Sequence, residues 1–366
     1  MKTMKSKFYS LALAAGMLTL TACSDDNTND SNNDKGNGIE NGSILKGTIT
    51  EDVTLKAGNT YKLSGEYIVE AGATLNIEEG VKIISVYDNI VDYILVKQGA
   101  KINAVGTPDK PIVMTSEKEE PGAWGGIHIC GKAHTNAEGG KGSSEIGGAV
   151  YGGNDDADNS GTLQYIRLEY TGFAFDEEHE ANGISFYGVG NGTIVDHCEA
   201  YKGSDDGFEF FGGSVNVSNM VVVSCSDDSF DWTEGWNGKG TDLVAYQEAK
   251  ATLGYDCDCL IEADNNENDN AATPVSHPVL KNLILAGNGE SKQGIRLRRG
   301  TQADIDNAKV CGKGQPLVVE SALTNAALKN GTSRLTNMTV TAALKSDGDY
   351  TNDDFTAVTS NKVDAT

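Results

Sequence analysis

The densest chemistry in the sequence is a pair of acidic motifs that lie 22 residues apart. Ser204-Asp-Asp-Gly-Phe-Glu-Phe is echoed by Ser226-Asp-Asp-Ser-Phe-Asp-Trp. If this spacing is one coil of a stacked fold, each acid of the first motif lies over its counterpart in the second. Like charges that close repel and raise each other's pKa unless a cation sits between them, and Ca²⁺ takes six to eight oxygen ligands. The sequence therefore predicts a site for Ca²⁺ or another divalent cation. The predicted ligands are Asp205, Asp206, Glu209, Asp227, Asp228 and Asp231.

Two other interpretations of these carboxylates stay open. Aspartate in a tight turn commonly accepts hydrogen bonds from its own backbone, and outward carboxylates are usually only solvated. Catalysis is the third interpretation. A second acidic stretch, residues 256–269, has six acids and no basic residue. It lacks the spacing and the glycine of an EF-hand, so we expect a mobile, solvated insertion loop there.

An enzymatic interpretation rests on two short motifs. Gly203-Ser-Asp-Asp-Gly resembles the Asp-Asp motif of polygalacturonases, which hydrolyse glycans with paired carboxylates. Arg296-Leu-Arg298 resembles their basic substrate clamp. None of the five histidines is followed by the glycine that this family carries, however. Pectate-lyase-like enzymes need an arginine base beside the Ca²⁺ carboxylates, and no arginine lies between Arg167 and Arg296. The motifs favour a protein without catalysis, and a polysaccharide lyase or glycoside hydrolase remains the alternative.

Aromatic residues suggest a binding function. If the apolar residues of each short strand point inward, the outward positions form rows along the stack. One row contains His128, Ser185, Glu209, Asp231 and Arg296, and the next contains Cys130, Tyr187, Phe211, Thr233 and Arg298. An exposed pair formed by Tyr187 and Phe211 would stack on sugar rings, with the acids as hydrogen-bond acceptors. The alternative is that the loop from Cys130 to Ser160 covers both rings.

The cysteines leave the disulfide pattern open. Six follow Cys23: Cys130, Cys198, Cys225, Cys257, Cys259 and Cys311. Six cysteines allow 15 pairings, which a sequence does not resolve. The first three lie in alternating strand patterns, which favours packed free thiols. The pair Cys257 and Cys259 is too sparse for a zinc site.

Repeats show which elements must position these residues. Val69-Glu-Ala-Gly-Ala-Thr-Leu-Asn-Ile returns 27 residues later as Val96-Lys-Gln-Gly-Ala-Lys-Ile-Asn-Ala. A short unit bounded by glycines recurs as Gly126-Ile-His-Ile-Cys-Gly, Gly183-Ile-Ser-Phe-Tyr-Gly and Gly207-Phe-Glu-Phe-Phe-Gly. Apolar residues at every second position indicate strands with one buried face, and the glycines indicate sharp turns.

Short strands, tight turns and a repeat of 22 to 27 residues predict an all-β fold. We expect a single-stranded parallel β-helix with glycine-rich turns and loop insertions, whose coils stack about 4.8 Å apart. A β-sandwich is the alternative, although it would need hairpin turns between strands. The alternation also predicts that Phe208, Phe210, Phe230 and Trp232 point into one core column. Helical periodicity occurs only at Ser321 to Asn330, which ends at Gly331 and predicts a short helix beside the last coils.

Three motifs in order carry a family resemblance. They are Gly122-Ala-Trp-Gly-Gly-Ile, Asn159-Ser-Gly-Thr-Leu-Gln-Tyr-Ile-Arg-Leu-Glu-Tyr and Asp205-Asp-Gly-Phe-Glu-Phe-Phe-Gly-Gly. The sequence from about Ile44 to Thr341 is similar to a family of right-handed parallel β-helix (pectin-lyase-like) bacterial surface lipoproteins of mostly unassigned function. The resemblance implies a right-handed helix and a surface location. The family usually has Asp-Asp-Ser-Phe-Glu-Trp-Phe-Gly where this chain has the third motif.

The first residues predict export and lipid attachment. Lys2, Lys5 and Lys7 precede an apolar stretch, Leu11 to Leu20, which is too short for a permanent membrane helix. Leu20-Thr-Ala-Cys23 resembles the bacterial lipobox, so we expect residues 1–22 to be a signal peptide and Cys23 to carry acyl chains. The alternative is an ordinary signal peptide followed by a chance cysteine.

Residues 23–43 are predicted to be an acidic, disordered tether. Ser24 to Ser43 has five acids, one lysine, six asparagines and no aromatic residue, so it lacks the apolar surface needed for folding. An acidic run after a lipidated cysteine also resembles the surface-export signal of some Gram-negative lipoproteins. We therefore expect an outer-membrane location facing outward, with residues 44–366 forming one β-helix domain.

Charge narrows the possible partners. The formal charge of −24 becomes −27 without the three lysines of the signal peptide. That sign disfavours nucleic acid and anionic lipid headgroups and attracts cations. The sequence as a whole predicts a monomeric surface lipoprotein, anchored in the membrane by its lipid, that acts as a binding or adhesion module for glycans. The alternatives are the polysaccharide-degrading enzyme and a purely structural stalk.

Overall fold

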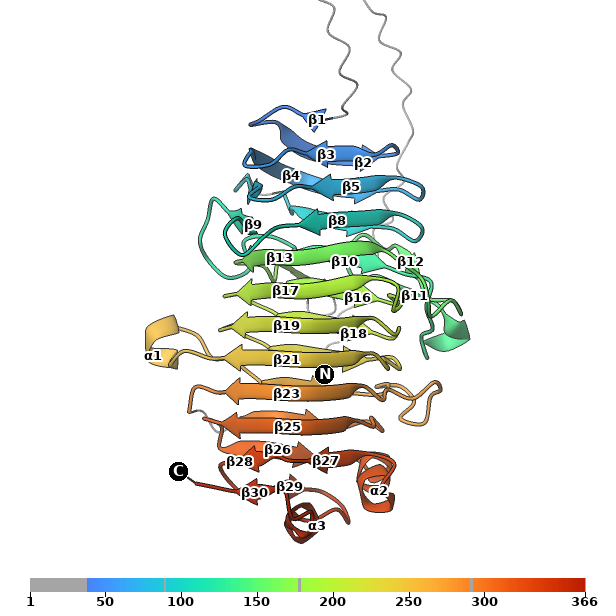
Figure 1. The fold of residues 1–366 in the computed structure, drawn as a ribbon, viewed down its shortest axis with the longest axis vertical. Coiled ribbons are helices and arrows are strands. Elements are labelled where there is room, and N and C mark those ends of the chain that lie inside the picture. The colour runs from blue at the N-terminus through green and yellow to red at the C-terminus, as the bar shows by residue number, and fades with distance from the viewer. Residues whose placement is uncertain (1–37, 89, 177–178, 290–291, 366) are drawn as a thin grey trace, which may run out of the picture. The chain divides into compact units, whose positions relative to one another are not determined.

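A computed structural model of the chain describes residues 38–88, 90–176, 179–289 and 292–365. The regular elements are almost all short strands, of which 26 belong to one continuous sheet. Each strand pairs in parallel with the equivalent strand of the next coil, so the chain climbs the stack one coil at a time (Figure 1). The architecture is a right-handed parallel β-helix, as the repeats and the family resemblance predict.

One side of the stack, which we call the first face, is a ladder of short strands. In order they are the second half of β4 (Thr60–Val69), then β7 (Tyr93–Val96), β10 (Ile127–Cys130), β16 (Ile184–Tyr187), β18 (Phe208–Phe211), β20 (Phe230–Thr233), β22 (Ile261–Ala263), β24 (Gln293–Leu297), β26 (Gln315–Val319) and β29 (Lys345–Ser346). Adjacent strands pair residue for residue, so outward side chains of successive coils lie side by side.

The second and third faces begin as separate strands. The early ones are β1 (Gly38–Ile39), β3 (Val53–Leu55), β5 (Thr74–Ile77) and β8 (Lys101–Val105) on the second face, and β6 (Lys82–Ser85) and β9 (Ile112–Ser116) on the third. β2 (Ile44–Ile49) pairs with β4 along the third and first faces. Six long strands then cover both faces: β13 (Gly161–Glu169), β17 (Ile194–Tyr201), β19 (Asn216–Val223), β21 (Lys239–Tyr246), β23 (Val279–Ala286) and β25 (Asp304–Cys311). The last coils contribute β27 (Arg334–Thr336), β28 (Thr339–Val340) and β30 (Lys362–Val363).

Each long strand bends at one residue with a left-handed backbone. These residues are Tyr165, His197, Asn219, Asp242, Asn282 and Asn307, and Asn337 occupies the same place between β27 and β28, with φ between 52° and 61°. Non-glycine residues rarely adopt this conformation, and asparagine and aspartate tolerate it best. The bend therefore recurs at one position in every coil and joins the second face to the third.

The core lies inside the stack and is continuous along it. Phe210 packs between Phe186 and Trp236, with ring centroids 5.0 Å and 4.1 Å away. Phe208, Phe210, Phe230 and Trp232 are all buried, which confirms the predicted inward column. The register that the alternation argument assigned to these strands is therefore correct.

Insertions and helices leave the stack at the turns. The connection after β10 contains a 3₁₀ turn (Glu138–Gly140) and an antiparallel pair, β11 (Gly142–Ser143) and β12 (Val150–Tyr151). A second antiparallel pair, β14 (Ala174–Asp176) and β15 (His179–Glu180), precedes β16. The helix α1 (Lys250–Leu253) lies in the turn after β21.

Two helices lie among the last coils, α2 (Ala322–Asn330) and α3 (Asn352–Ala357) (Figure 1). Ser321 caps the start of α2 through the backbone N–H of Thr324, and Gly331 ends it with φ of 82°. The predicted helix is confirmed. Within the described residues, no helix has the length and apolar character needed to cross a bilayer.

The N-terminal predictions are only partly accessible to the structure. The signal peptide, Cys23 and residues 23–37 lie outside the described residues. The predicted boundary at Ile44 falls too late, because Gly38–Ile39 already form β1 and pair with Thr54 and Leu55 of β3. The backbone pairing of this glycine and isoleucine outweighs the polar composition around them.

Candidate functional site

The two acidic motifs stack as their spacing predicts. Glu209 of β18 pairs with Asp231 of β20. In the turns that precede these strands, the backbone N–H of Asp228 donates to Oδ1 of Asp206 at 2.8 Å. Gly207 permits this close approach, since a Cβ there would lie 2.6 Å from the carbonyl oxygen of Ser229. Consecutive coils of equal length therefore bring the two motifs into register.

The motifs form the centre of a cavity of about 860 Å³ on the first face, which we call the acidic cleft. Two arginines and Asn182 line it together with eleven acids: Glu145, Glu180, Asp205, Asp206, Glu209, Asp227, Asp228, Asp231, Asp258, Glu262 and Glu267. All six predicted ligands belong to this set. The structure also adds five carboxylates that the sequence motifs do not include.

Carboxylate oxygens meet closely enough to share a cation. Three groups of residues have ligand atoms that all lie within 4.8 Å of one another, and two of these groups share Asp206. They are Asp205 with Asp206 and Asp227, Asp206 with Glu209 and Asp231, and Asp228 with Glu262 and the thiol of Cys259. The two groups made only of carboxylates suit Ca²⁺, which accepts irregular geometry.

Burial and mutual repulsion raise the pKa of these acids. Burial is the largest cause for Asp206, and the charges of Asp205 and Glu209 add to it. Burial likewise raises the pKa of Asp228 and of Asp231, and the charge of Glu262 makes the largest electrostatic contribution in both cases. Each charge lacks the water that would screen it, so the cluster favours protons or a bound cation over free carboxylates.

Some of the acids also cap turns, as the simplest interpretation expects. Asp206 accepts from the backbone of Asp228, and Asp228 accepts from the backbone N–H of Cys259 at 2.6 Å. Glu209 accepts from the side-chain amide of Asn182 at 2.6 Å. In contrast, Oδ1 of Asp231 has no solvent contact and no hydrogen-bond partner among the described residues. A buried carboxylate oxygen without a partner costs free energy, so this atom marks a place for a ligand.

Arginines do reach the site, contrary to the inference from their distance in sequence. Arg296 pairs with Glu262 at 3.0 Å, and Arg298 pairs with Glu262 and with Asp264, the latter at 2.7 Å. Strand β24 stacks on β22, which stacks on β20, so residues far along the chain become neighbours. Burial disfavours the charged form of Arg298, but its two carboxylate partners raise its pKa overall. In this arrangement Arg298 stays protonated and is not a base.

The second acidic stretch is not a mobile loop. Ile261–Ala263 form β22, and Leu260, Ile261 and Ala263 are buried in the core. Glu262 thereby points into the cleft in the row of Glu209 and Asp231. The alternation of Leu260 to Asp264 was a strand signal, which the high acid content of the stretch obscured.

Tyr187 and Phe211 do not form an exposed aromatic pair. Tyr187 is fully buried and Phe211 is 8% exposed. Their rings stack on each other at 4.5 Å, and Tyr151 of the insertion lies 5.1 Å from Tyr187. Ile146 and Ala149 complete the cover. The predicted outward direction of the two side chains is correct. The loop between Cys130 and Ser160 covers both rings, however, so the predicted sugar platform is wrong.

The covered aromatic cluster nevertheless borders a second cavity, of about 340 Å³. Glu145, Glu209, Asp231, Glu267 and Arg298 line both this cavity and the acidic cleft. Tyr151, Tyr187, Phe211, Thr233 and Arg299 also line it. The two cavities therefore adjoin along the first face, one acidic and one of mixed character.

The six cysteines of the described chain are unpaired, and only Cys311 is partly exposed. Cys130, Cys198 and Cys225 are buried thiols, as predicted. Burial raises the pKa of Cys198 and of Cys225 to about 12, so neither is a thiolate at neutral pH.

Comparisons with known proteins agree with this architecture. The family model of the pectate-lyase-like β-helix domain matches residues 47–366. No curated protein and no solved structure matches the chain significantly. Because the match covers most of the sequence and the strands stack as such a domain requires, the chain belongs to the pectate-lyase-like β-helix domain family.

Proposed function

We propose that this protein is a lipid-anchored binding module of the outer-membrane surface that holds a glycan at the acidic cleft through Ca²⁺. The observation that carries the cation is Asp231, whose Oδ1 is buried and unpartnered and whose carboxylate has an oxygen within 4.8 Å of oxygens of Asp206 and Glu209. A divalent ion there would satisfy this atom and remove the repulsion between stacked acids.

The glycan part of the proposal rests on what adjoins the acids. Sugars offer hydroxyl groups that coordinate cations and hydrogen-bond to carboxylates, and apolar C–H faces that pack on aromatic rings. The neighbouring cavity supplies three aromatic residues, Thr233 and two arginines beside the acids. An acidic glycan would bind only with cations bound, because eleven carboxylates repel it otherwise.

Calorimetry with the full chain in detergent tests this function. Ca²⁺ should bind after chelator treatment, and a panel of acidic polysaccharides should bind only in its presence. Asp231→Asn should abolish both. Binding of acidic polysaccharides that ignores chelator, or no Ca²⁺ binding at all, would contradict the proposal.

Polysaccharide cleavage is the second candidate. The observation that favours it is the set of buried, adjacent carboxylates with raised pKa, because a raised pKa favours the protonated form that a general acid needs. Measuring product release from the same polysaccharide panel separates the two functions. Turnover that disappears in Glu209→Gln while binding persists would establish the enzyme.

The anchor is a separate part of the proposal. Its support is the lipobox-like Leu20-Thr-Ala-Cys23. Cys23→Ala should remove metabolic fatty-acid labelling and membrane partitioning, because no other residue supplies the thioether sulfur. Persistent labelling of the variant would show that Cys23 is not the attachment site.

A further inference from the structure

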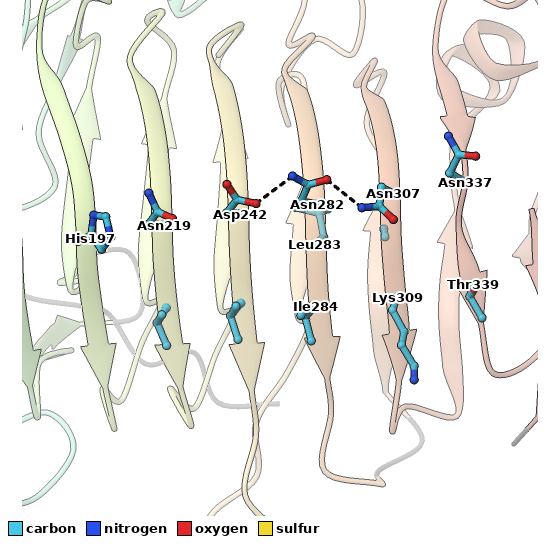
Figure 2. A pocket seen from close by; sticks show the side chains of 13 residues that line it. His197, Asn219, Asp242, Asn282, Leu283, Ile284, Asn307, Lys309, Asn337 and Thr339 are labelled. Atoms are coloured by element: carbon cyan, nitrogen blue, oxygen red, sulfur yellow. Dashed lines mark hydrogen bonds between the residues drawn. The ribbon is translucent and has the colours of Figure 1, made fainter. Parts of the chain in front are cut away.

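A third cavity, of about 550 Å³, lies away from the acidic cleft, at the bend between the second and third faces. Figure 2 shows its lining as two rows that run across neighbouring strands. One row consists of bend residues, among them Asn219, Asp242, Asn282 and Asn307. We call this cavity the amide groove.

The groove follows from the bend itself. The side chain of each left-handed bend residue points outward, next to the outward side chains of the strand residues that follow it. Every coil with such a bend repeats this arrangement. The register continues the second row from coil to coil: Val221 pairs with Val244, Val244 with Ile284 and Ile284 with Lys309. The groove is therefore a straight channel along the stack, with one equivalent position per coil.

The polar wall has hydrogen-bonding capacity to spare. Asn282 donates to Asp242 at 2.9 Å, and Asn307 donates to Asn282 at 2.8 Å (Figure 2). A primary amide has two N–H groups and two acceptor lone pairs. These bonds use one N–H of each asparagine, so donors and acceptors remain for a ligand with hydroxyl groups.

The opposite wall is aliphatic and open to solvent. Ile284 is 58% exposed, and Val221 and Val244 are half-buried in the same row. A single exposed aliphatic side chain is ordinary, but here three stand in line beside a row of amides. Such a wall suits the C–H face of a sugar ring.

Charge separates this groove from the rest of the molecule. Its lining contains one carboxylate, Asp242, and one lysine, Lys309, whereas the cleft has eleven acids. On a chain with a formal charge of −24, this is a surface on which a neutral ligand meets little net charge.

The sheet geometry disfavours an extended peptide as the occupant. Addition of a peptide strand needs a free strand edge. Here β19, β21 and β23 each pair with a neighbour on both sides. A linear glycan needs no strand edge, and one pyranose residue in an extended chain is close in length to the coil spacing of about 4.8 Å.

We propose that the amide groove binds a neutral, extended β-1,4-linked polysaccharide that lies along the stack, one sugar residue per coil, independently of the cation site. The amides bind its hydroxyl groups, and the valines and Ile284 pack against alternate ring faces.

Titration of the full chain in detergent with cellohexaose, xylohexaose and mannohexaose tests the proposal, with hexagalacturonate as the anionic comparison. At least one neutral probe should bind, equally well in chelator and in Ca²⁺. Ile284→Asp should weaken that binding by about tenfold or more, because the new carboxylate is desolvated against an apolar ring face. Val279→Asp is the matched control, since Val279 lies on the same strand, is 44% exposed and does not line the groove.

Several outcomes would overturn the proposal. The first is that none of the three neutral probes binds, and the second is that both variants lose binding equally. The third is that chelator removes the binding of a neutral probe, which would place that binding in the acidic cleft. A fourth outcome comes from sedimentation. If the wild-type chain self-associates and Ile284→Asp alone is monomeric, the groove is a contact between copies.

Discussion

The acidic cleft and the amide groove are built by the same coils, and they differ in what the stacked positions carry. In the groove, Asn282 donates to one neighbour and accepts from the next. In the cleft, Glu209 faces Asp231, and neither has a proton to offer when ionised. Amide side chains that stack in register therefore hydrogen-bond to one another, whereas stacked carboxylates need protons or cations to relieve their repulsion.

Substitutions in the core test whether the two regions share one interior, and they should have the largest effect. Phe210→Ala, beneath the cleft, should lower the free energy of unfolding by about 3–5 kcal/mol, and Leu283→Ala, beneath the groove, by about 2–5 kcal/mol, because both leave cavities. Chemical denaturation measures both. A change within roughly 0.5 kcal/mol at either position is typical of the surface and would contradict the inward register there.

His128 provides a test in the cleft's own row, two coils before Glu209, the first acid of that row. Burial lowers its pKa to about 4 from an ordinary 6.5, and Nδ1 has no hydrogen-bond partner among the described residues. The unfolded chain takes up the proton first as the pH falls. The contribution of neutral His128 to the free energy of unfolding is therefore complete above pH 6.5 and is lost as the pH falls towards 4. The loss is roughly 3 kcal/mol at most.

Denaturation of the wild-type chain and of His128→Leu, measured at several pH values between 4 and 7, isolates this contribution. Leucine suits the site because Leu95 occupies the same position one coil earlier. The difference in stability between the two proteins should favour the variant increasingly as the pH falls. A constant difference would mean that His128 takes up a proton as readily in the folded state as in the unfolded chain, which would contradict the lowered pKa.

Cation binding should distinguish the two regions most directly. Raising Ca²⁺ to about 100 times its dissociation constant should stabilise the fold by about 2.7 kcal/mol and raise the melting temperature. The double variant Asp205→Asn with Asp227→Asn should be less responsive, and in chelator it should melt higher than wild type, because two repelling charges are gone. Asp242→Asn in the groove is the control, and its response to Ca²⁺ should match wild type.

Substitution in the amide ladder should have the smallest effect. Asn282→Ala loses two side-chain hydrogen bonds and places a Cβ-bearing residue without a local polar group at φ of 61°, for a total of about 1–2 kcal/mol. Asn282→Gly loses the same hydrogen bonds, but glycine adopts this left-handed backbone conformation easily. The free energy of unfolding should therefore fall by less than in Asn282→Ala. Equal costs in the two variants would assign the whole effect to the hydrogen bonds.

Sequence periodicity predicted the fold and the centre of the cleft because the coils there are regular. The turns before β18 and β20 have the same length, so a 22-residue echo became a vertical stack. The helix at 322–330 was predictable for a similar local reason, since Ser321 and Gly331 mark its two ends.

The rest of the cleft was hidden by irregular turns and by tertiary cover. The connection from β21 to β22 is lengthened by α1, which breaks the repeat and separates Glu262 and Arg298 from the motifs that they join. Alternation told which way Tyr187 points, but not that residues 142–151 fold back over it. The amide groove needed the backbone angles, because asparagines 20 to 40 residues apart have no shared pattern until their strands are aligned.

The residue-for-residue pairing of the coils has a consequence for how such a protein evolves. Each coil contacts mainly its two neighbours, so stability accumulates coil by coil. Duplication of the segment from Phe208 to Ser229 would insert one further coil of the same length, with its own copy of Glu209 in line with the others. The acidic cleft and the amide groove would lengthen together by one step of about 4.8 Å, with the turns unchanged. The length of the stack would therefore change only in steps of one whole coil.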